Sequence, residues 1–563
     1  MRISFLACSL LFCALSMAQS NRFWKESRLS GSLETNNQYY LDNKRGNIVA
    51  PIKKFASNSY LNVNYQYKGF TAGLQLEGYN PALQGFPTRY QGNQLVRRFA
   101  RYKNKWLDVQ AGNFYEQFGN GLIFRAFEER SLGLDNNIDG IGIRLAPIQS
   151  IKLKFIGGRP RYFMERSPGE VWGVDAEWNL LNKEQTEKIQ LLQIGASYVS
   201  RSMRYYGADP RFPEQVNAFA TRVSGQLDDF SFSGEWVSKS TEANFPNDFI
   251  KKKGRLFFLK TGWQDPTNRT GLQLQFRRLE NADYKGNFNS SDAVASLNYV
   301  PALTRQHTNL LANIYPHAVQ PIGEIGGMAD LFIRFKKNTP LGGKFGTRLD
   351  INYSIYHALD STRVLTGEGF TSNRFFGFGK TKLFRDLNLS VDKRWSTSYK
   401  TVFTFINLFY NRSILQGGPY ANVRASLMAT DHYIKIKKKQ QLRINAEHMW
   451  VNNDERNWAG LLLEWSLPSG LSIFFSDMTN YQSAKMHYYN TGRAFKKQTA
   501  HSTKCWAATR RPLMCRRHLP IRPLLQRIFA QLQFESLIRN SEFDQLQPLV
   551  HSKPVCWLLS PYH

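Results

Sequence analysis

Alternation between apolar and polar residues over positions 58–80 constrains the fold of this chain more than any other feature. Residues 61–67 (LNVNYQY) and 70–77 (FTAGLQLE) alternate with a period of two, and Lys68-Gly69 supplies a turn between them. That period is the side-chain period of a β-strand, so the hairpin has one apolar and one polar face. Strands of about ten residues with aromatic ends are typical of a membrane β-barrel. A hairpin of a soluble β-sandwich is the alternative that this stretch alone leaves open.

The same pattern recurs along the body of the chain. Short turns mostly alternate along the chain with longer loops rich in Gly, Pro and Asn. This is expected for a barrel with short periplasmic turns and longer outside loops. The sequence therefore predicts an all-β fold, a transmembrane antiparallel β-barrel of roughly 22–24 strands within residues 19–495. The clearest further strands are residues 95–102, 106–114, 139–147, 151–157, 219–227, 230–236, 272–276, 349–355, 387–391, 402–410, 461–467 and 471–477. The segment 280–328 is less regular, and it could form a strand pair, a loop or a lumenal plug.

The N-terminal segment predicts export. Residues 1–18 contain a basic Arg2, an apolar core over residues 3–15 and a small-x-small cleavage site at Ser16-Met17-Ala18, which together indicate a cleaved signal peptide. No later stretch offers 18 uninterrupted apolar residues, the length of a membrane-spanning helix. Only helices and closed barrels satisfy the backbone in lipid. We therefore expect a barrel in the outer membrane of a Gram-negative bacterium.

Composition fits a barrel. Aromatic residues make up 14% of the chain and the mean hydropathy is −0.44, as expected when only every second strand residue must be apolar. The formal charge of +31 would usually suggest nucleic acid, but the basic residues are spread among strands and loops, so no nucleic-acid partner is expected. A lumen that selects small anionic solutes, or loops that meet lipid phosphates, is the better use of this charge. The expected partners are therefore outer-membrane lipid and lipopolysaccharide, the barrel-assembly machinery, and a small anionic solute.

Residues 112–140 form one dense stretch without alternation, GNFYEQFGNGLIFRAFEERSLGLDNNIDG. Its charged residues Arg125, Glu128, Glu129 and Arg130 are the candidate lumen constriction. The alternative is a loop folded into the lumen and held by structural ion pairs. No motif for a hydrolase, a phosphate loop or a metal centre occurs, and His307 and His317 lack metal-like spacing. We therefore expect no enzyme activity, no catalytic residue, no metal and no cofactor.

Two segments carry a family resemblance, the dense stretch just quoted and LTRQHTNLLANIYPHAVQPIGEIG at residues 303–326. Through them the chain resembles a family of outer-membrane β-barrel proteins of unknown function found in the Bacteroidota. The resemblance runs from the signal peptide to about Gly492. It implies a barrel in the outer membrane and carries over no substrate or chemistry.

The C-terminal tail, residues 496–563, differs from the body. It has no Gly and contains Cys505, Cys515 and Cys556, all the cysteines outside the predicted signal peptide. Pro520 and Pro523 would interrupt any strand ladder, so a non-barrel tail is expected. A frameshifted reading near residues 490–500 is the preferred explanation, and a genuine accessory tail is the other.

Two functional classes follow from these observations. The first is a pore or transport protein for small, possibly anionic, solutes. The second is a structural or partner-binding barrel of a secretion or surface-assembly machine.

Overall fold

A computed structural model describes residues 27–42, 49–181, 189–205, 212–300, 302–364, 369–437, 440–454, 456–482 and 486–495. The predicted signal peptide and the predicted tail lie outside these residues. Strands dominate, and the helical segments within the described residues are short. They are η1 (Thr88–Tyr90), η2 (Arg130–Leu132), η3 (Phe245–Asn247), η4 (Ala293–Ala295), η5 (Leu311–Ile314) and α3 (Arg412–Gln416). Among the described residues, no helix is long and apolar enough to cross a membrane.

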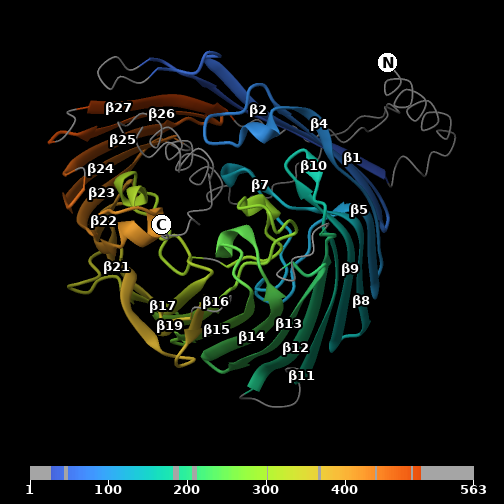
Figure 1. The fold of residues 1–563 in the computed structure, drawn as a ribbon. Coiled ribbons are helices and arrows are strands. Elements are labelled where there is room, and N and C mark those ends of the chain that lie inside the picture. The colour runs from blue at the N-terminus through green and yellow to red at the C-terminus, as the bar shows by residue number, and fades with distance from the viewer. Residues whose placement is uncertain are drawn as a thin grey trace, which may run out of the picture.

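One antiparallel sheet of 23 strands forms a ring around inward-folded loops (Figure 1). Its first half contains β1 (Ser27–Tyr39), β2 (Phe55–Tyr67), β3 (Phe70–Tyr79), β4 (Gly92–Lys103), β5 (Leu107–Phe114), β8 (Ile138–Ile148), β9 (Ile151–Tyr162), β10 (Glu165–Arg166), β11 (Glu170–Leu181), β12 (Ile189–Ser202) and β13 (Gln215–Leu227). Its second half contains β14 (Phe230–Glu242), β15 (Lys252–Gln264), β16 (Thr270–Glu280), β17 (Gly323–Phe335), β18 (Thr347–Leu359), β21 (Phe378–Arg394), β22 (Tyr399–Tyr410), β23 (Val423–Lys437), β24 (Gln440–Asn452), β25 (Trp458–Ser466), β26 (Leu471–Asn480) and β27 (Met486–Phe495).

The strands pair with their neighbours in sequence order, and β10 is only a two-residue extension beside β9. The remaining 22 strands confirm the predicted all-β barrel and its predicted strand number. Within the described residues, no ladder joins β27 back to β1. Two small hairpins lie outside the main sheet. They are β6 (Glu128–Glu129) with β7 (Leu134–Asp135), and β19 (Ser361–Arg363) with β20 (Phe370–Ser372).

The hairpin at residues 58–80 has the predicted faces. Leu61 pairs with Leu76 and Val63 with Leu74 across the Lys68-Gly69 turn. Leu74 and Leu76 are 49% and 44% exposed, whereas the intervening Gln75 is 1% exposed and faces the interior. Large apolar side chains are thus exposed on the outside, and polar side chains are buried inside. This is the arrangement of a strand that lies between lipid and a polar lumen.

The two ends of the ring are unlike. Short connections such as Lys68-Gly69, Asp228-Asp229 and residues 468–470 lie at one end, the turn end. The long connections, including residues 115–137 and residues 281–322, lie at the other end, the loop end, and fold back into the ring (Figure 1). Because antiparallel strands follow one another in sequence order, successive connections alternate between the two ends, and β1 begins and β27 finishes at the turn end.

Candidate functional site in the barrel lumen

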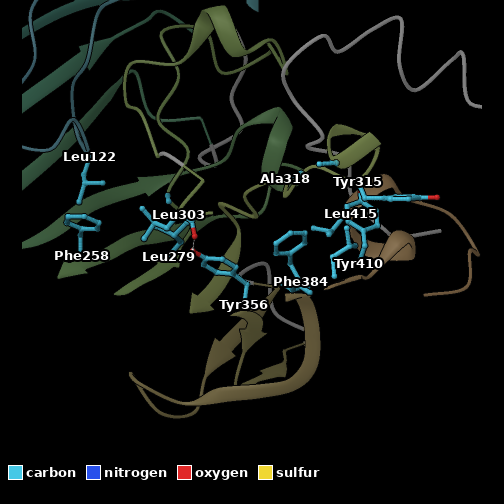
Figure 2. Close-up of a cluster of buried hydrophobic side chains, with 14 of the residues drawn as sticks. Leu122, Phe258, Leu279, Leu303, Tyr315, Ala318, Tyr356, Phe384, Tyr410 and Leu415 are labelled. Atoms are coloured by element: carbon cyan, nitrogen blue, oxygen red, sulfur yellow. Dashed lines mark hydrogen bonds between the residues drawn. The ribbon is translucent and has the colours of Figure 1, made fainter. Parts of the chain in front are cut away.

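The segment between β16 and β17 fills the loop end of the lumen, and we call residues 281–300 and 302–322 the plug. The plug settles the ambiguity of segment 280–328 in favour of a lumenal element. It contributes buried apolar side chains such as Leu311 and Tyr315 to a cluster shared with the barrel wall. Figure 2 shows Tyr315 beside Tyr410 and Leu415, with ring centroids of the two tyrosines 5.6 Å apart. The plug is therefore packed as a protein core is packed.

A few polar contacts fix the plug to the wall. The Glu447 carboxylate on β24 accepts hydrogen bonds from the backbone N–H groups of Leu310 (2.7 Å) and Leu311 (2.8 Å). The Tyr315 hydroxyl donates to Asp454 Oδ2 at 2.6 Å. Tyr356 on β18 donates to the carbonyl oxygen of Leu303 (Figure 2). These bonds satisfy backbone groups that an irregular buried segment would otherwise leave without partners.

His317 of the plug lies in a closed ionic pocket. Its Nε2 atom is 3.3 Å from Glu324, and Arg277 Nε donates to Glu324 at 3.0 Å. The imidazole stacks on Tyr356 with centroids 4.4 Å apart. Burial lowers the pKa of His317 below its ordinary value, although the Glu324 carboxylate acts in the opposite direction. His317 is therefore neutral at pH 7.

On the opposite side of the ring, acids and bases alternate along the inner surface from β4 to β13, which we call the charge wall. Arg144 on β8 contacts both Asp108 (3.3 Å) and Glu116 (2.5 Å). Further along, Lys154 lies 3.5 Å from Asp175, and Arg222 lies 2.7 Å from Asp175. Arg101 and Glu177 extend the series at its two ends. Each of the charges just named has an opposite neighbour, which offsets the cost of placing it on the barrel wall.

The structure does not bring the four residues of the candidate constriction into one cluster. Within the part of the chain that the structure describes, Arg125 makes no ion pair with Glu128 or Glu129. Its guanidinium lies over the rings of Phe127 (4.5 Å) and Tyr299 (4.1 Å). Its backbone N–H donates to Leu297 O, which ties residues 115–127 to the plug. Arg125 bridges to Gln117, whereas Glu128 and Glu129 pair with residues 134–135 in the β6–β7 hairpin, so nearness in sequence does not bring Arg125 to the glutamates.

Arg130 and Glu128 do meet. Arg130 Nε lies 2.7 Å from Glu128 Oε1, and Arg130 Nη1 lies 2.9 Å from Glu34. Burial alone would lower the pKa of the Arg130 guanidinium, but Glu128 and Glu34 outweigh it and raise that pKa. Glu129 is exposed. The local arrangement is that of an inward loop held by an ion pair, and a role in constricting the lumen stays a prediction.

Glu128 also belongs to a buried acidic group with Glu77 and Asp135, whose oxygens lie within 4.8 Å of one another. Arg161 enters this group, donating to Glu77 Oε2 at 2.7 Å and pairing with Asp135. Gln75 Nε2 donates to Glu77 (3.0 Å) and to Glu128 (2.9 Å). A guanidinium and an amide thus occupy the positions that a cation would need.

A third feature is a cluster of cations at the turn end, which we call the basic rim. Its members line a pocket of about 440 Å³ between the ends of β16, β17, β18, β21 and β22. They are Arg269, Arg334, Lys336, Lys337, Arg348, Arg394 and Lys400.

Reasoning from sequence missed Glu447, Arg161 and the basic rim as functional candidates. The rim cations carried a usable signal, because several of them sit at or next to strand ends beside short turns. Glu447 carried no such sequence signal, because its carboxylate gains two backbone donors only when the plug packs against β24 in the folded protein.

Comparison with known proteins gives a family and distant structural neighbours. Residues 1–516 match the model of a family of unknown function (DUF6029). A search of curated proteins found no match. The outer membrane protein opdK from Pseudomonas aeruginosa is 10% identical over 76% of this chain and 100% of its own, with a TM-score of 0.36. The P pilus usher (PapC) translocation pore is 9% identical over 84% and 99%, with a TM-score of 0.35. A BenF-like porin from Pseudomonas fluorescens Pf-5 is 8% identical over 79% and 99%, with a TM-score of 0.33.

Proposed function

Because the chain belongs to the DUF6029 family, whose function is unknown, we propose its function from the geometry of its lumen. We propose an outer-membrane channel for small, anionic solutes that opens when the plug moves. Export by a cleaved signal peptide, short turns in the periplasm, and contact with outer-membrane lipid, lipopolysaccharide and the barrel-assembly machinery are parts of the same proposal. So is a constriction that includes Arg130 and Glu128.

One observation carries the proposal. Asn352 on β18 and Asn388 on β21 lie directly opposite each other and are 0% exposed, yet neither amide has a hydrogen-bond partner among the described residues. Asn445 on β24 is in the same situation. Buried amides are normally satisfied, and each that is not costs about 1–3 kcal/mol. Because these unpaired amides lie on the inner surface in spite of that cost, we infer that water or solute contacts them when the channel is open.

Swelling of proteoliposomes tests this function. The full chain is reconstituted into liposomes, and swelling is followed in isosmotic solutions of an anionic, a neutral and a cationic solute of similar size. We expect the fastest swelling with the anionic solute, because the rim and the formal charge of +31 favour anions. Equal rates for the three solutes, or a preference for the cation, contradict the assignment.

The packing of the plug favours a second candidate, a structural or partner-binding barrel. Leu311 is 0% and Tyr315 is 3% exposed, so the plug is as deeply buried as a permanent core. A barrel that never opens would give no swelling with any solute, and would instead be recovered bound to other envelope proteins after crosslinking.

A further inference from the structure

The basic rim is strongly unbalanced in charge. Seven cations line its pocket of about 440 Å³, and Asp392 is the one carboxylate among its lining residues. Pockets of roughly 300–1,000 Å³ are ordinary for small ligands. On the charge wall, by contrast, Arg101, Arg144, Lys154 and Arg222 each have an acidic neighbour.

Strand register places the rim on the lumenal side. Arg334 lies opposite Arg348, Arg348 opposite Asp392, and Arg394 opposite Lys400. Residues directly opposite each other point to the same face of a sheet, and the face changes with every residue along a strand. Arg348 therefore shares a face with the buried Asn352, four positions away on β18, and Tyr353, at 38% exposure, faces outward.

Two guanidinium groups of the rim are held in place. Arg334 and Arg348 both lie over the Phe332 ring, at 4.9 and 5.1 Å from its centroid. Arg334 Nη1 donates to Asn268 O at 2.8 Å, and Arg348 donates to Asp350 Oδ1 through Nε (2.9 Å) and Nη2 (2.7 Å). Stacking on Phe332 and hydrogen bonding at one edge fix the orientation of each planar guanidinium group. The remaining N–H donors of each group can then bind a ligand in the pocket. A fixed fork suits the oxygens of phosphate or carboxylate.

Four of the other five cations add charge that no ion pair offsets among the described residues. No ion pair joins Arg269, Lys336, Lys337 or Arg394 to a carboxylate of the described residues, whereas Lys400 pairs with Asp392 at 2.6 Å. Their combined field attracts an anion toward the two fixed guanidinium groups.

We propose that the basic rim is a binding site for an oxyanion, a phosphate or carboxylate carried by a small solute, with Arg334 and Arg348 as its direct ligands. The same chemistry could come from a lipid headgroup. The lumenal orientation of the rim assigns the site to a free solute. This goes beyond the proposed channel function, because the site can bind whether or not the lumen conducts.

Calorimetric titration tests the site. Inorganic phosphate is titrated at low salt into the full chain, purified from membranes in a nonionic detergent. The variant is Arg334→Gln/Arg348→Gln, and the control is Lys103→Gln, an exposed cation at the turn end of β4 outside the rim. We expect phosphate affinity to fall at least about tenfold in the variant, because each lost charge-assisted hydrogen bond contributes on the order of tenfold. The control should bind as the parent does, and added NaCl should weaken binding in both.

Heat-modifiable gel migration shows whether each variant is folded, and only folded protein is compared. An equal loss of phosphate affinity in variant and control would show that the effect comes from net charge alone, and would overturn the proposed site. Unchanged affinity in the variant would also overturn it.

Competition separates the two sources. Glycerol 3-phosphate and a short-chain phosphatidylglycerol are each used to displace phosphate. Equal or stronger displacement by glycerol 3-phosphate supports a free solute, and clearly stronger displacement by the lipid overturns that assignment. A negative titration leaves the swelling experiment unaffected, so failure of the site and failure of the channel are distinguishable.

Discussion

The charge wall and the opposite side of the lumen show how one strand pattern builds two different inner surfaces. On β22 to β25, which we call the plug wall, inward residues near the loop end are apolar and buried, including Leu408, Leu427 and Met449. On β8, β9, β11 and β13, inward residues are charged and paired, as in the Arg144, Lys154 and Arg222 series. Exposed apolar side chains such as Phe155 and Phe403 cover the outside of both.

The difference between the two walls shows which strand positions the membrane constrains. Lipid requires apolar residues on the outer face alone, so alternation is preserved all around the ring. The residue type at an inner position depends instead on the side chains that contact it from within the lumen. Against the plug many inner residues are apolar, with a few charged anchors such as Glu447, whereas on the charge wall they are charged and paired. The two walls should therefore respond differently to substitution.

The largest effect is expected beside the charge wall, at Arg161. Arg161→Gln leaves Glu77 and Asp135, both nearly fully buried, without their shared cation. Loss of one partner from a buried ion pair costs about 3–5 kcal/mol. Thermal unfolding in detergent should show a large decrease in stability, partly restored by adding Glu77→Gln. Strictly additive effects of the two substitutions would show that the residues do not act together.

The outer surface common to both walls is tested by two adjacent residues on β16. Leu274 is 46% exposed and faces outward, whereas Gln273 lies opposite Asp330 on the inner face. Leu274→Arg should cost about 2–4 kcal/mol near the bilayer midplane, and Gln273→Arg should be tolerated beside the acid. Heat-modifiable migration measures assembly of each variant. Equal assembly of the two variants would mean that the faces are wrongly assigned.

A more local effect is expected on the plug wall, at Glu447. Glu447→Ala removes the acceptor of two backbone N–H groups, at about 1–3 kcal/mol for each group left unsatisfied. The barrel should still assemble, but the plug should loosen, and trypsin should cut after Arg305 more rapidly than in the parent. Glu447→Gln, which keeps one acceptor oxygen, should be intermediate. Unchanged cleavage in both variants would show that the plug does not depend on this anchor.

The smallest effect concerns pH. Because the pKa of His317 is lowered in the packed plug, protonation favours the state in which the imidazole is solvated. Stability of the packed plug is thus complete above the ordinary pKa of 6.5 and decreases as the pH falls below it. Cleavage after Arg305 should accelerate on acidification, and His317→Gln should reduce this dependence. A pH dependence identical in parent and variant would assign it to other groups.

Sequence reasoning predicted the barrel because alternation needs only the chain itself. The Leu61–Leu76 hairpin and the strand pair joined at Asn104 are where the pattern placed them. Contacts across the lumen could not be predicted in this way. Period two tells which face a residue occupies, but not which residue stands opposite. Arg161 meets Glu77, 84 positions away, and Glu447 meets Leu310, 137 positions away. Arg125 also differs from expectation, because its guanidinium lies over Tyr299 of the plug, whereas Glu128 belongs to the β6–β7 hairpin.

The most direct test of the account is to lock the plug. A Cβ atom built on Gly460 of β25 would lie 3.4 Å from Leu311 Cγ, so the double variant Leu311→Cys/Gly460→Cys places the two side chains close enough to test for a disulfide. Cys505, Cys515 and Cys556 are changed to Ser in the same background, and each single variant is the control. Conductance is measured across planar bilayers before and after reduction. We expect the oxidised double variant to be silent and reduction to restore anion-selective steps, while the single variants conduct throughout. Conductance that is the same before and after reduction of a fully formed disulfide would contradict it.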